Sequence, residues 1–407
     1  MKTGNRIYKR RLLSGLFCFL PKKCILFLGK SFSSYVTIYK SVNLDMKIKN
    51  LIFLAGMAGL CACVKGTHTQ KAYDFAPLDT IISAWMDKGY YPGGAVCVMK
   101  DDSVLFRKDY GGFTDSTQVY VASAGKWVAA AVVAAVVDTT ALDWDDPVEK
   151  WLPEFRGDVK GGIPLRRLLS HTSGIRPYLP EPRVDNYNHL DSAVAEILPL
   201  DTVFTPGTHF EYGGLAMQVA GRMAEVAAGK EFETLFQQLI AAPLGMRHSH
   251  FTPVNTDGGH APMLGGGLCT TLADYMRFLK MISHEGVYEG KRILKAETVR
   301  EMQADQVGSA QVMPGEYVER ALGKHHTGVY GLGEWRELLD EQTGEAYQIS
   351  SPGWAGAYPW INKREGVCGF FIAHVQGGSS KEDGFSSFYG SPVLSRTVSE
   401  IVGTNNK

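Results

Sequence analysis

Apolar residues recur at helical spacing from about residue 76 and predict a helix that ends near Gly89. Two apolar runs follow, over 94–99 and 103–108, with Asp101-Asp102 between them. Runs of this length around an acidic turn are typical of a β-hairpin. The first part of the folded region is therefore expected to be a helix followed by a hairpin.

The middle of the chain, from about residue 121 to 300, has a mainly helical pattern, and strands return from about residue 328. The expected C-terminal elements are strands at 329–338, 346–349, 357–361 and 367–373, and a closing amphipathic helix at 391–402. Strands at both ends with helices between them predict one discontinuous domain over 76–403. We expect an α/β (α+β) fold in which an antiparallel sheet of N- and C-terminal strands is flanked by helices. A mostly helical lobe, at about 140–300, would be inserted between the sheet segments.

The first 62 residues do not have the pattern of a folded segment. Met46 starts a short basic stretch that leads into about ten apolar residues and then Leu60-Cys61-Ala62-Cys63. The apolar run is too short to span a bilayer, which needs about 20 helical residues, and it fits a secretory signal. The residues around Cys63 resemble the lipobox of bacterial lipoproteins, whose final cysteine is lipidated. We expect a lipoprotein signal peptide at 46–62, a lipidated Cys63 and a tether at 63–75; a single transmembrane anchor is the alternative.

Residues 1–45 lie upstream of this complete signal, so we expect them to be untranslated or unstructured, with translation starting at Met46. A genuine long N-terminal region is the alternative. The expected location is the cell envelope. The lipid would hold the chain to a membrane, with the domain on the periplasmic or extracellular side.

Charge is distributed unevenly, although the 42 basic and 42 acidic residues of the 407-residue chain cancel. Residues 1–62 hold eleven basic residues and one acid, which leaves the remainder at about −10. A negative body without a basic stripe argues against nucleic-acid binding. Beyond Cys63, three cysteines remain, all among apolar neighbours, and their spacing indicates neither a zinc site nor a disulfide framework. They are Cys97, Cys269 and Cys368.

A serine and a lysine stand at the start of a run without a polar face. Ser123 and Lys126 precede the apolar segment 127–137, which predicts a helix buried on all sides. Residues three apart share a helical face, so the lysine would lie one turn from the serine. A serine hydroxyl needs an adjacent base to become a nucleophile, and burial disfavours the charged form of a lysine. The alternative is an N-cap serine followed by a lysine that extends to solvent.

Two longer segments follow this pair: one begins with Asp145-Asp146-Pro147-Val148 and ends with Leu152-Pro153-Glu154-Phe155, and the other contains Leu168-Leu169-Ser170-His171-Thr172-Ser173-Gly174. Together with the serine and lysine, they resemble the family of class C β-lactamases, D-alanyl-D-alanine peptidases and related serine esterases. The resemblance runs from about residue 90 to 373 and is weakest over 305–345. It implies that Ser123 is the nucleophile and Lys126 its base or proton relay, and that His171 shapes the pocket wall without reacting.

The family's second motif, Tyr-x-Asn, corresponds to Tyr212-Gly213-Gly214. By resemblance, Tyr212 would exchange protons with Ser123 and the leaving group, and a phenol beside Lys126 should have its anion favoured. A core tyrosine at a helix entry is the alternative. Gly214 replaces the usual asparagine, whose amide contacts the lysine and an amide carbonyl of the substrate. This departure puts recognition of β-lactam or peptide side-chain amides in doubt.

The third motif, usually Lys-Thr-Gly or His-x-Gly, corresponds to Ser351-Pro352-Gly353. By resemblance, the backbone N–H groups of Ser123 and Trp354 would form the oxyanion hole, with Gly214, Ser351, Pro352 and Gly353 lining the pocket. A strand–bulge–strand corner is the alternative. Because Ser351 removes the cation that would hold a substrate carboxylate, we favour neutral esters over anionic lactams or peptides. His325, His326 or Arg336 could replace that cation.

The sequence therefore predicts a serine hydrolase that works through an acyl-enzyme on Ser123, with esters or related acyl compounds as substrates. This chemistry needs no metal or organic cofactor. A β-lactamase or D-Ala-D-Ala carboxypeptidase is the alternative within the class, and a catalytically inactive surface binding protein is the alternative from another class. The expected partners are a small acyl or ester substrate or a cell-wall peptide, and a membrane through the N-terminal lipid.

Overall fold

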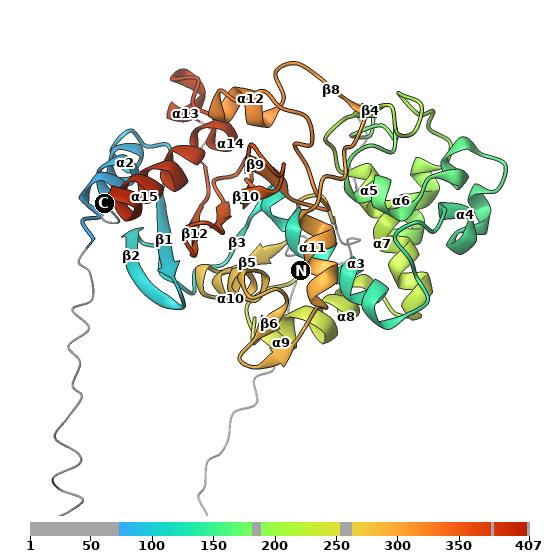
Figure 1. Ribbon diagram of the computed structural model, residues 1–407, viewed down its shortest axis with the longest axis horizontal. Helices are drawn as coiled ribbons and strands as arrows, with labels where there is room; N and C mark the ends of the chain where they lie inside the picture. Colours follow the sequence, from blue (N-terminus) through green and yellow to red (C-terminus); the bar gives the residue numbers. More distant parts are fainter. Residues whose placement is uncertain (1–72, 181–188, 253–262, 376–377, 405–407) are drawn as a thin grey trace, which may run out of the picture. The chain divides into compact units, whose positions relative to one another are not determined.

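The computed structural model describes residues 73–180, 189–252, 263–375 and 378–404, and residues Ala72–Lys407 form one compact unit (Figure 1). The predictions for the segment 1–45, the signal peptide at 46–62 and the lipidated Cys63 lie outside the described residues. They remain predictions.

Six strands form one sheet in the order β2-β1-β12-β11-β10-β9, and every neighbouring pair is antiparallel. The first and last strands of the chain lie side by side, with Gly94 opposite Ala373 and Lys100 opposite Val367. This arrangement confirms the expected α/β (α+β) fold with its antiparallel sheet. The strands are β1 (Gly93–Lys100), β2 (Ser103–Gly111), β9 (Trp335–Leu339), β10 (Ala346–Ser350), β11 (Tyr358–Asn362) and β12 (Val367–Ala373).

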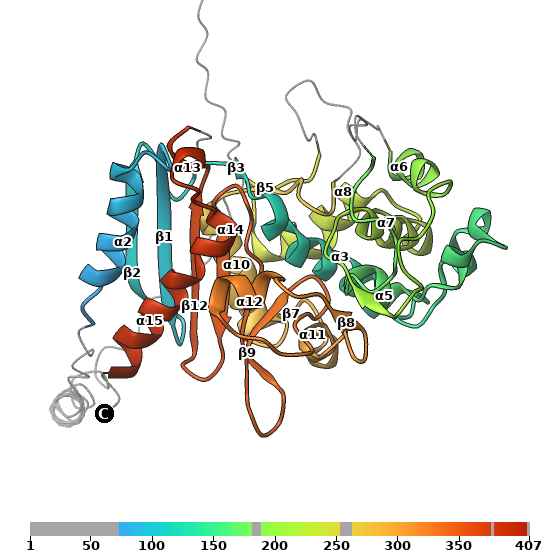
Figure 2. The same ribbon diagram turned by 90° about the horizontal axis from the view of Figure 1, so that it is seen from above.

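Helices cover both faces of the sheet (Figure 2). On one face, α2 (Ala76–Asp87) and α15 (Pro392–Thr404) pack over side chains such as Val96, Trp360 and Phe371. On the other face, α3 (Gly125–Thr139) and α10 (Leu272–Ser283) bury the alternate side chains, among them Cys97 and Phe370. The sheet is therefore the middle layer of three, because strands such as β1 and β12 bury side chains on both of their faces.

The run without a polar face forms α3, and its residues from Gly125 to Val136 are all buried. With the preceding turn, it is long and apolar enough to cross a membrane, and it is the one such helix among the described residues. Since most of that stretch is already enclosed by protein, α3 is the central helix of the core. The sequence prediction of a helix buried on all sides is confirmed.

The stretch between the first hairpin and β9 is mainly helical, as expected, and three short two-stranded pairings escaped prediction: β3 with β5, β4 with β8, and β6 with β7. Two-residue strands carry too little periodicity to be recognised. The helices are α4 (Val148–Trp151), α5 (Leu165–Leu169), α6 (Leu190–Ile197), α7 (Leu215–Ala228), α8 (Phe232–Phe236), a π-turn (Gln237–Ala241), α9 (Ala242–Leu244), α11 (Ala296–Gln303) and α12 (Tyr317–Leu322). The short strands are β3 (Val119–Tyr120), β4 (His209–Phe210), β5 (Cys269–Thr270), β6 (Val287–Tyr288), β7 (Lys291–Arg292) and β8 (Gln311–Val312), and two further short helices are α13 (Ser379–Glu382) and α14 (Ser387–Gly390).

The strand expected from residue 329 begins later, at Trp335. Gly333 explains the delay, because it has a φ of +83°, which an extended strand does not allow. A Cβ at Gly333 would lie 2.8 Å from the carbonyl oxygen of Lys126. The chain therefore bends closely past the start of α3 before it enters the sheet.

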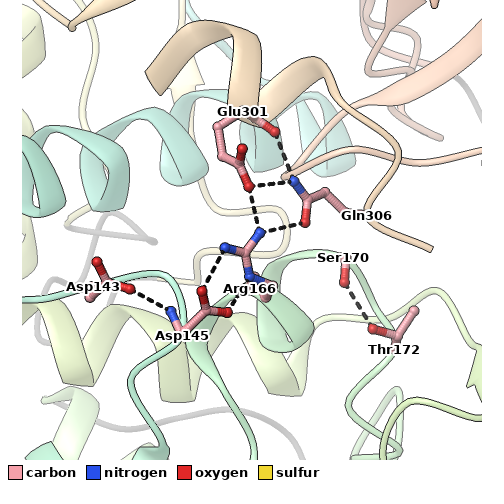
Figure 3. Close-up of polar contacts among 7 residues, drawn as sticks. All are labelled: Asp143, Asp145, Arg166, Ser170, Thr172, Glu301 and Gln306. Atoms are coloured by element: carbon pink, nitrogen blue, oxygen red, sulfur yellow. Dashed lines mark hydrogen bonds and ion pairs between the residues drawn. The ribbon is translucent and has the colours of Figure 1, made fainter. Parts of the chain in front are cut away.

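Arg166 joins the two motif segments that follow α3 (Figure 3). Its guanidinium donates to both carboxylate oxygens of Asp145, at 2.6 and 3.1 Å, and to Oε1 of Glu301 at 2.5 Å. Gln306 accepts from the same guanidinium at 3.1 Å and donates to Glu301. Two-point arginine–carboxylate pairing is geometrically specific. It therefore holds the segment around Asp145, helix α5 and helix α11 in a defined arrangement.

Candidate active site

Ser123 and Lys126 come together at the start of α3. Ser123 lies in the short 3-10 turn Ala122–Ala124, and Lys126 occupies the first turn of the helix. Lys126 Nζ donates to Ser123 Oγ at 3.0 Å. The preceding residue, Ala122, has a φ of +49°, a strained value for a residue with a Cβ. Strained backbone of this kind is found where a side chain must be presented in a defined direction.

Lys126 is 2% exposed, and its amine also donates to the carbonyl oxygen of Gly265 at 2.5 Å. Both acceptors are neutral, so neither compensates a buried positive charge as a carboxylate would. Burial lowers the pKa of Lys126 to about 7. The amine is therefore neutral in a large fraction of molecules near neutral pH, as a base for the Ser123 hydroxyl must be.

Tyr212 lies against the same amine, since Lys126 Nζ is 4.6 Å from the centroid of its ring. The hydroxyl is buried and has no hydrogen-bond partner of good geometry among the described residues. Burial raises the pKa of Tyr212, while Ser123 and Trp335 oppose that rise only in part. The expectation of a favoured Tyr212 anion is therefore wrong, because the cost of burying a phenolate exceeds the help from its neighbours.

His171 lies behind Tyr212, with 4.7 Å between the two ring centroids. It is 3% exposed, and its Nε2 lies 3.3 Å from the Tyr330 hydroxyl. Burial, and secondarily the charge of Lys126, lower the pKa of His171 well below its ordinary value. A neutral, enclosed imidazole in an aromatic cluster agrees with the expected lack of a reactive role, but His171 is not among the described residues that line the cavity beside Ser123.

The Ser351-Pro352-Gly353 segment packs directly on the turn that carries the serine. A Cβ on Gly353 would lie 2.1 Å from the carbonyl oxygen of Val121, so only glycine fits there. Ser351 is buried, and its hydroxyl donates to the carbonyl oxygen of Ser123 at 3.1 Å. Ser351 therefore supports the backbone of Ser123, and the expectation that Ser351, Pro352 and Gly353 line the pocket is not met, since none of the three is among the residues that line the cavity beside Ser123. Trp354 follows as a largely exposed side chain, 64% accessible.

Ser123 opens into a cavity of about 500 Å³. Among the described residues that line it, Lys126 is the single Lys or Arg. The three replacements that the sequence left open are engaged elsewhere: Arg336 donates to backbone carbonyls of Gln303, Gly328 and Gly344, His325 lies 3.5 Å from Glu319, and His326 contacts Thr327. The lining comprises Tyr120, Ala122, Ser123, Lys126, Pro177, Tyr178, Leu179, Gly214, Leu215, Gln218, Met263, Gly265, Gly266, Trp354, Ala355 and His374.

A larger cavity, of about 760 Å³, lies between α10, α11 and the sheet and does not include Ser123. Its charged side chains largely pair with one another, as Lys280 does with Asp102 and Arg300 with Glu285. Choosing the cavity by volume alone would therefore select one that lacks Ser123 and Lys126. The smaller cavity is the candidate active site because it holds the serine with its adjacent amine.

Gly265 and Gln218 are among the cavity residues that sequence reasoning missed. Gly265 approaches so closely that its Cβ would lie 2.9 Å from the Cα of Gly214 and 3.6 Å from Lys126 Nζ. The run Gly265-Gly266-Gly267 was a usable signal for close backbone approach. Gln218 gave no signal, because a glutamine on an amphipathic helix is ordinarily exposed to solvent.

Comparison with known families agrees with this geometry. A family model described as Beta-lactamase matches residues 78–385. Esterase EstB of Burkholderia gladioli is 27% identical over 216 residues, which cover 47% of this chain and 55% of EstB. Protein flp of Staphylococcus aureus (strain MW2) is 26% identical over 197 residues, which cover 45% of this chain and 39% of flp. The chain thus matches about half of the length of these curated relatives, or less.

Solved structures match a larger share of the chain than these curated relatives do. A crystal structure from Bacteroides dorei DSM 17855, provisionally described as a β-lactamase, is 80% identical and superposes with a TM-score of 0.79, covering 81% of this chain and 99% of its own. EstCE1, a hydrolase with promiscuous acyltransferase activity, is 18% identical with a TM-score of 0.61, covering 78% of this chain and 96% of its own. The penicillin-binding protein homologue of Pyrococcus abyssi is 20% identical with a TM-score of 0.62, covering 81% and 78%. The last two likenesses establish the fold alone.

Proposed function

The chain belongs to the β-lactamase family, and on that premise we propose that it is a serine hydrolase that cleaves neutral esters through an acyl-enzyme on Ser123. The observation that carries the proposal is the pair formed by Ser123 and Lys126. The serine Oγ lies 3.0 Å from an amine whose pKa is lowered to about 7, and both side chains line one cavity. A nucleophile, an adjacent base and space for a substrate are the minimum for this chemistry.

The reaction would proceed in two halves. Ser123 Oγ attacks the ester carbonyl carbon while neutral Lys126 takes the hydroxyl proton, and the N–H groups of Ser123 and Trp354 stabilise the resulting oxyanion. The ester C–O bond then breaks, and the leaving alcohol takes that proton through Tyr212 or directly from Lys126. Water attacks the acyl-Ser123 carbonyl, which releases the carboxylic acid and restores the serine.

The preference for neutral esters is supported by the lining of the cavity. A β-lactam or a D-Ala terminus presents a carboxylate, and such groups are usually held by an arginine or lysine. In the described part of the cavity, the single lysine is Lys126, which already contacts Ser123 and Gly265. Much of the remaining lining is apolar, including Tyr178 and Trp354. EstB, which matches part of this chain, is described as an esterase, and this likeness also supports the preference for esters.

The test is hydrolysis of p-nitrophenyl acetate by the purified protein and by two variants. Ser123→Ala should abolish turnover above the uncatalysed rate, because the acyl-enzyme cannot form. Ser192→Ala, at an exposed serine on α6, is the matched control and should keep full activity. Equal turnover by the Ser123→Ala variant and the unmodified protein would exclude Ser123 as the nucleophile.

The alternatives give different outcomes in the same set of experiments. Hydrolysis of nitrocefin in preference to esters would favour a β-lactamase. A stable adduct with a fluorescent penicillin would favour a peptidase. If a fluorophosphonate fails to label Ser123, the protein is an inactive binder with the same fold. Intact mass after incubation with an ester, a cephalosporin and a D-Ala-D-Ala peptide, in separate tubes, distinguishes these substrates directly.

We also propose that a lipid on Cys63 holds the enzyme at a membrane of the cell envelope. The support is the short apolar run ahead of Leu60-Cys61-Ala62-Cys63. Cys63→Ala should move the protein from the membrane fraction to the soluble fraction, whereas Cys61→Ala should leave it at the membrane. Equal membrane association of both variants would contradict lipidation at Cys63.

A further inference from the structure

We propose that Gln218 is a substrate-binding residue that donates a hydrogen bond from Nε2 to a carbonyl oxygen on the acyl group of the substrate. The inference rests on the proposed ester hydrolase function and deepens it. It specifies acyl groups that carry a hydrogen-bond acceptor a few atoms from the ester carbonyl as the preferred substrates.

Gln218 is both buried and part of the active-site cavity. Its side chain is 4% exposed, and it lines the same cavity as Ser123. It lies on α7, four residues after Gly214, so the two positions share one face of the helix. A polar side chain enclosed at this depth usually has hydrogen-bond partners for both ends of its amide.

Only one end of the Gln218 amide is satisfied by the protein. Oε1 accepts from the backbone N–H of Leu264 at 2.9 Å. Because a backbone N–H can pair only with the oxygen end, this bond also determines where the amide nitrogen lies. Within the described residues, no protein acceptor pairs with Nε2, and Nε2 is not one of the fully enclosed unpaired side-chain atoms, so it keeps some exposure. An unpaired amide donor in a cavity wall is therefore available to a bound molecule that brings an acceptor.

The surrounding glycines explain why this donor is needed and why a substrate can reach it. The resemblance leads us to expect an asparagine at Gly214 that contacts both the lysine and a substrate carbonyl. The contact with the lysine is supplied here by the carbonyl of Gly265, at 2.5 Å from Lys126 Nζ. A Cβ at Gly214 would have a single neighbouring atom within 4 Å, at 3.9 Å. Space is thus free beside Gly214, and Gln218 can take over the second contact.

The test compares two esters of nearly identical shape. The acyl group of p-nitrophenyl 4-oxopentanoate carries a ketone oxygen, and that of p-nitrophenyl 4-methylpentanoate carries a methyl group in its place. The Gln218→Glu variant keeps the oxygen that Leu264 requires and removes the donor. The new carboxylate could change the pKa of Lys126 or lower the stability of the protein, and such effects would change kcat/KM for both esters equally. They cancel in the ratio of the two kcat/KM values, which therefore reports the hydrogen bond alone.

We expect the unmodified protein to prefer the 4-oxopentanoate roughly tenfold, the size of effect typical of one hydrogen bond, and Gln218→Glu to abolish or reverse that preference. No preference in the unmodified protein, or an unchanged preference in Gln218→Glu, would overturn the role of Gln218 while leaving the ester hydrolase intact. If neither ester is turned over in a manner that depends on Ser123, the proposed function itself fails, and this inference fails with it.

Discussion

Lys126 and Glu337 are both buried ionisable residues, but their surroundings are opposite. Glu337, in β9, is fully buried and accepts from the hydroxyls of Tyr317, Ser350 and Tyr358 and from Gln348 Nε2. Burial raises the pKa of Glu337, and these four donors oppose that rise. Lys126 has two neutral acceptors, and nothing comparable opposes its burial.

We interpret the difference as one between a structural group and a group suited to chemistry. A buried polar group whose hydrogen bonds are all made stiffens the fold, whereas one that is only partly satisfied stays available for chemistry. Two consecutive serines connect the regions: Ser350 donates to Glu337, and Ser351 donates to the carbonyl of Ser123. The two environments therefore meet at the end of one strand.

The largest expected effect is on activity when the reactive amine is removed. Lys126→Met should lower kcat/KM for p-nitrophenyl acetate by about 10²- to 10⁴-fold, the usual contribution of a positioned base. Glu337→Gln, assayed below its melting temperature, should have a kcat/KM for the same ester within about twofold of that of the unmodified protein. A loss of less than tenfold in Lys126→Met would remove the amine from the mechanism.

The same substitution should stabilise the protein. A folded-state pKa of about 7, against 10.5 for the free side chain, means that the unfolded chain binds the proton more tightly. Burying Lys126 therefore lowers the free energy of unfolding by a few kcal/mol, with an upper bound of about 5. This destabilisation is greatest below pH 7 and disappears as the pH rises to about 10.5. The melting temperature of Lys126→Met should therefore exceed that of the unmodified protein at pH 6, with a gap that narrows at pH 9. A lower melting temperature at pH 6 would contradict this account.

The pH dependence of kcat/KM should report the amine. Because only neutral Lys126 can accept the serine proton, kcat/KM should rise about tenfold per unit up to pH 7 and then level off. Burial raises the pKa of Tyr212, so its ionisation should add no step near neutrality. The profile is measured with p-nitrophenyl acetate, and rates independent of pH between 5 and 7 would argue against Lys126 as the base.

Glu337→Gln should act on stability instead. The new amide turns an NH₂ group toward side chains that already donate, which leaves buried hydrogen bonds unmade and costs about 1–3 kcal/mol. Urea unfolding measures this loss. A variant as stable as the unmodified protein would show that the four contacts of Glu337 contribute little.

The smallest effect is expected at the junction of the two regions. Ser351→Ala removes the hydrogen bond to the Ser123 carbonyl, a net loss of about 0.5–1.5 kcal/mol. Activity should fall less than tenfold, because Ser351 supports the turn and does not face the substrate. A loss as large as that in Lys126→Met would instead give Ser351 a direct part in catalysis.

The predictable part of the fold was the part with strong periodicity. The first hairpin, the buried helix α3 and the closing helix were all expected from the pattern, and the expected position of β9 was wrong where Gly333 bends the chain. In the site, the spacing of Ser123 and Lys126 placed them together, because one helical turn is local geometry. Their motif also led to Tyr212, but not to the direction of its pKa shift, which depends on how deeply the hydroxyl is enclosed.

The amino-acid sequence by itself determined the family resemblance, the α/β (α+β) architecture and the pairing of a serine with a lysine on one helical face. Only the tertiary structure decided that the carbonyl of Gly265, 139 positions away along the chain, contacts Lys126, and that Gln218 lines the same cavity as Ser123. The positions of residues one helical turn apart follow from the local sequence, whereas contacts between distant segments depend on how the whole core packs. For that reason, the proposed chemistry could be inferred from the sequence, and the proposed role of Gln218 could not.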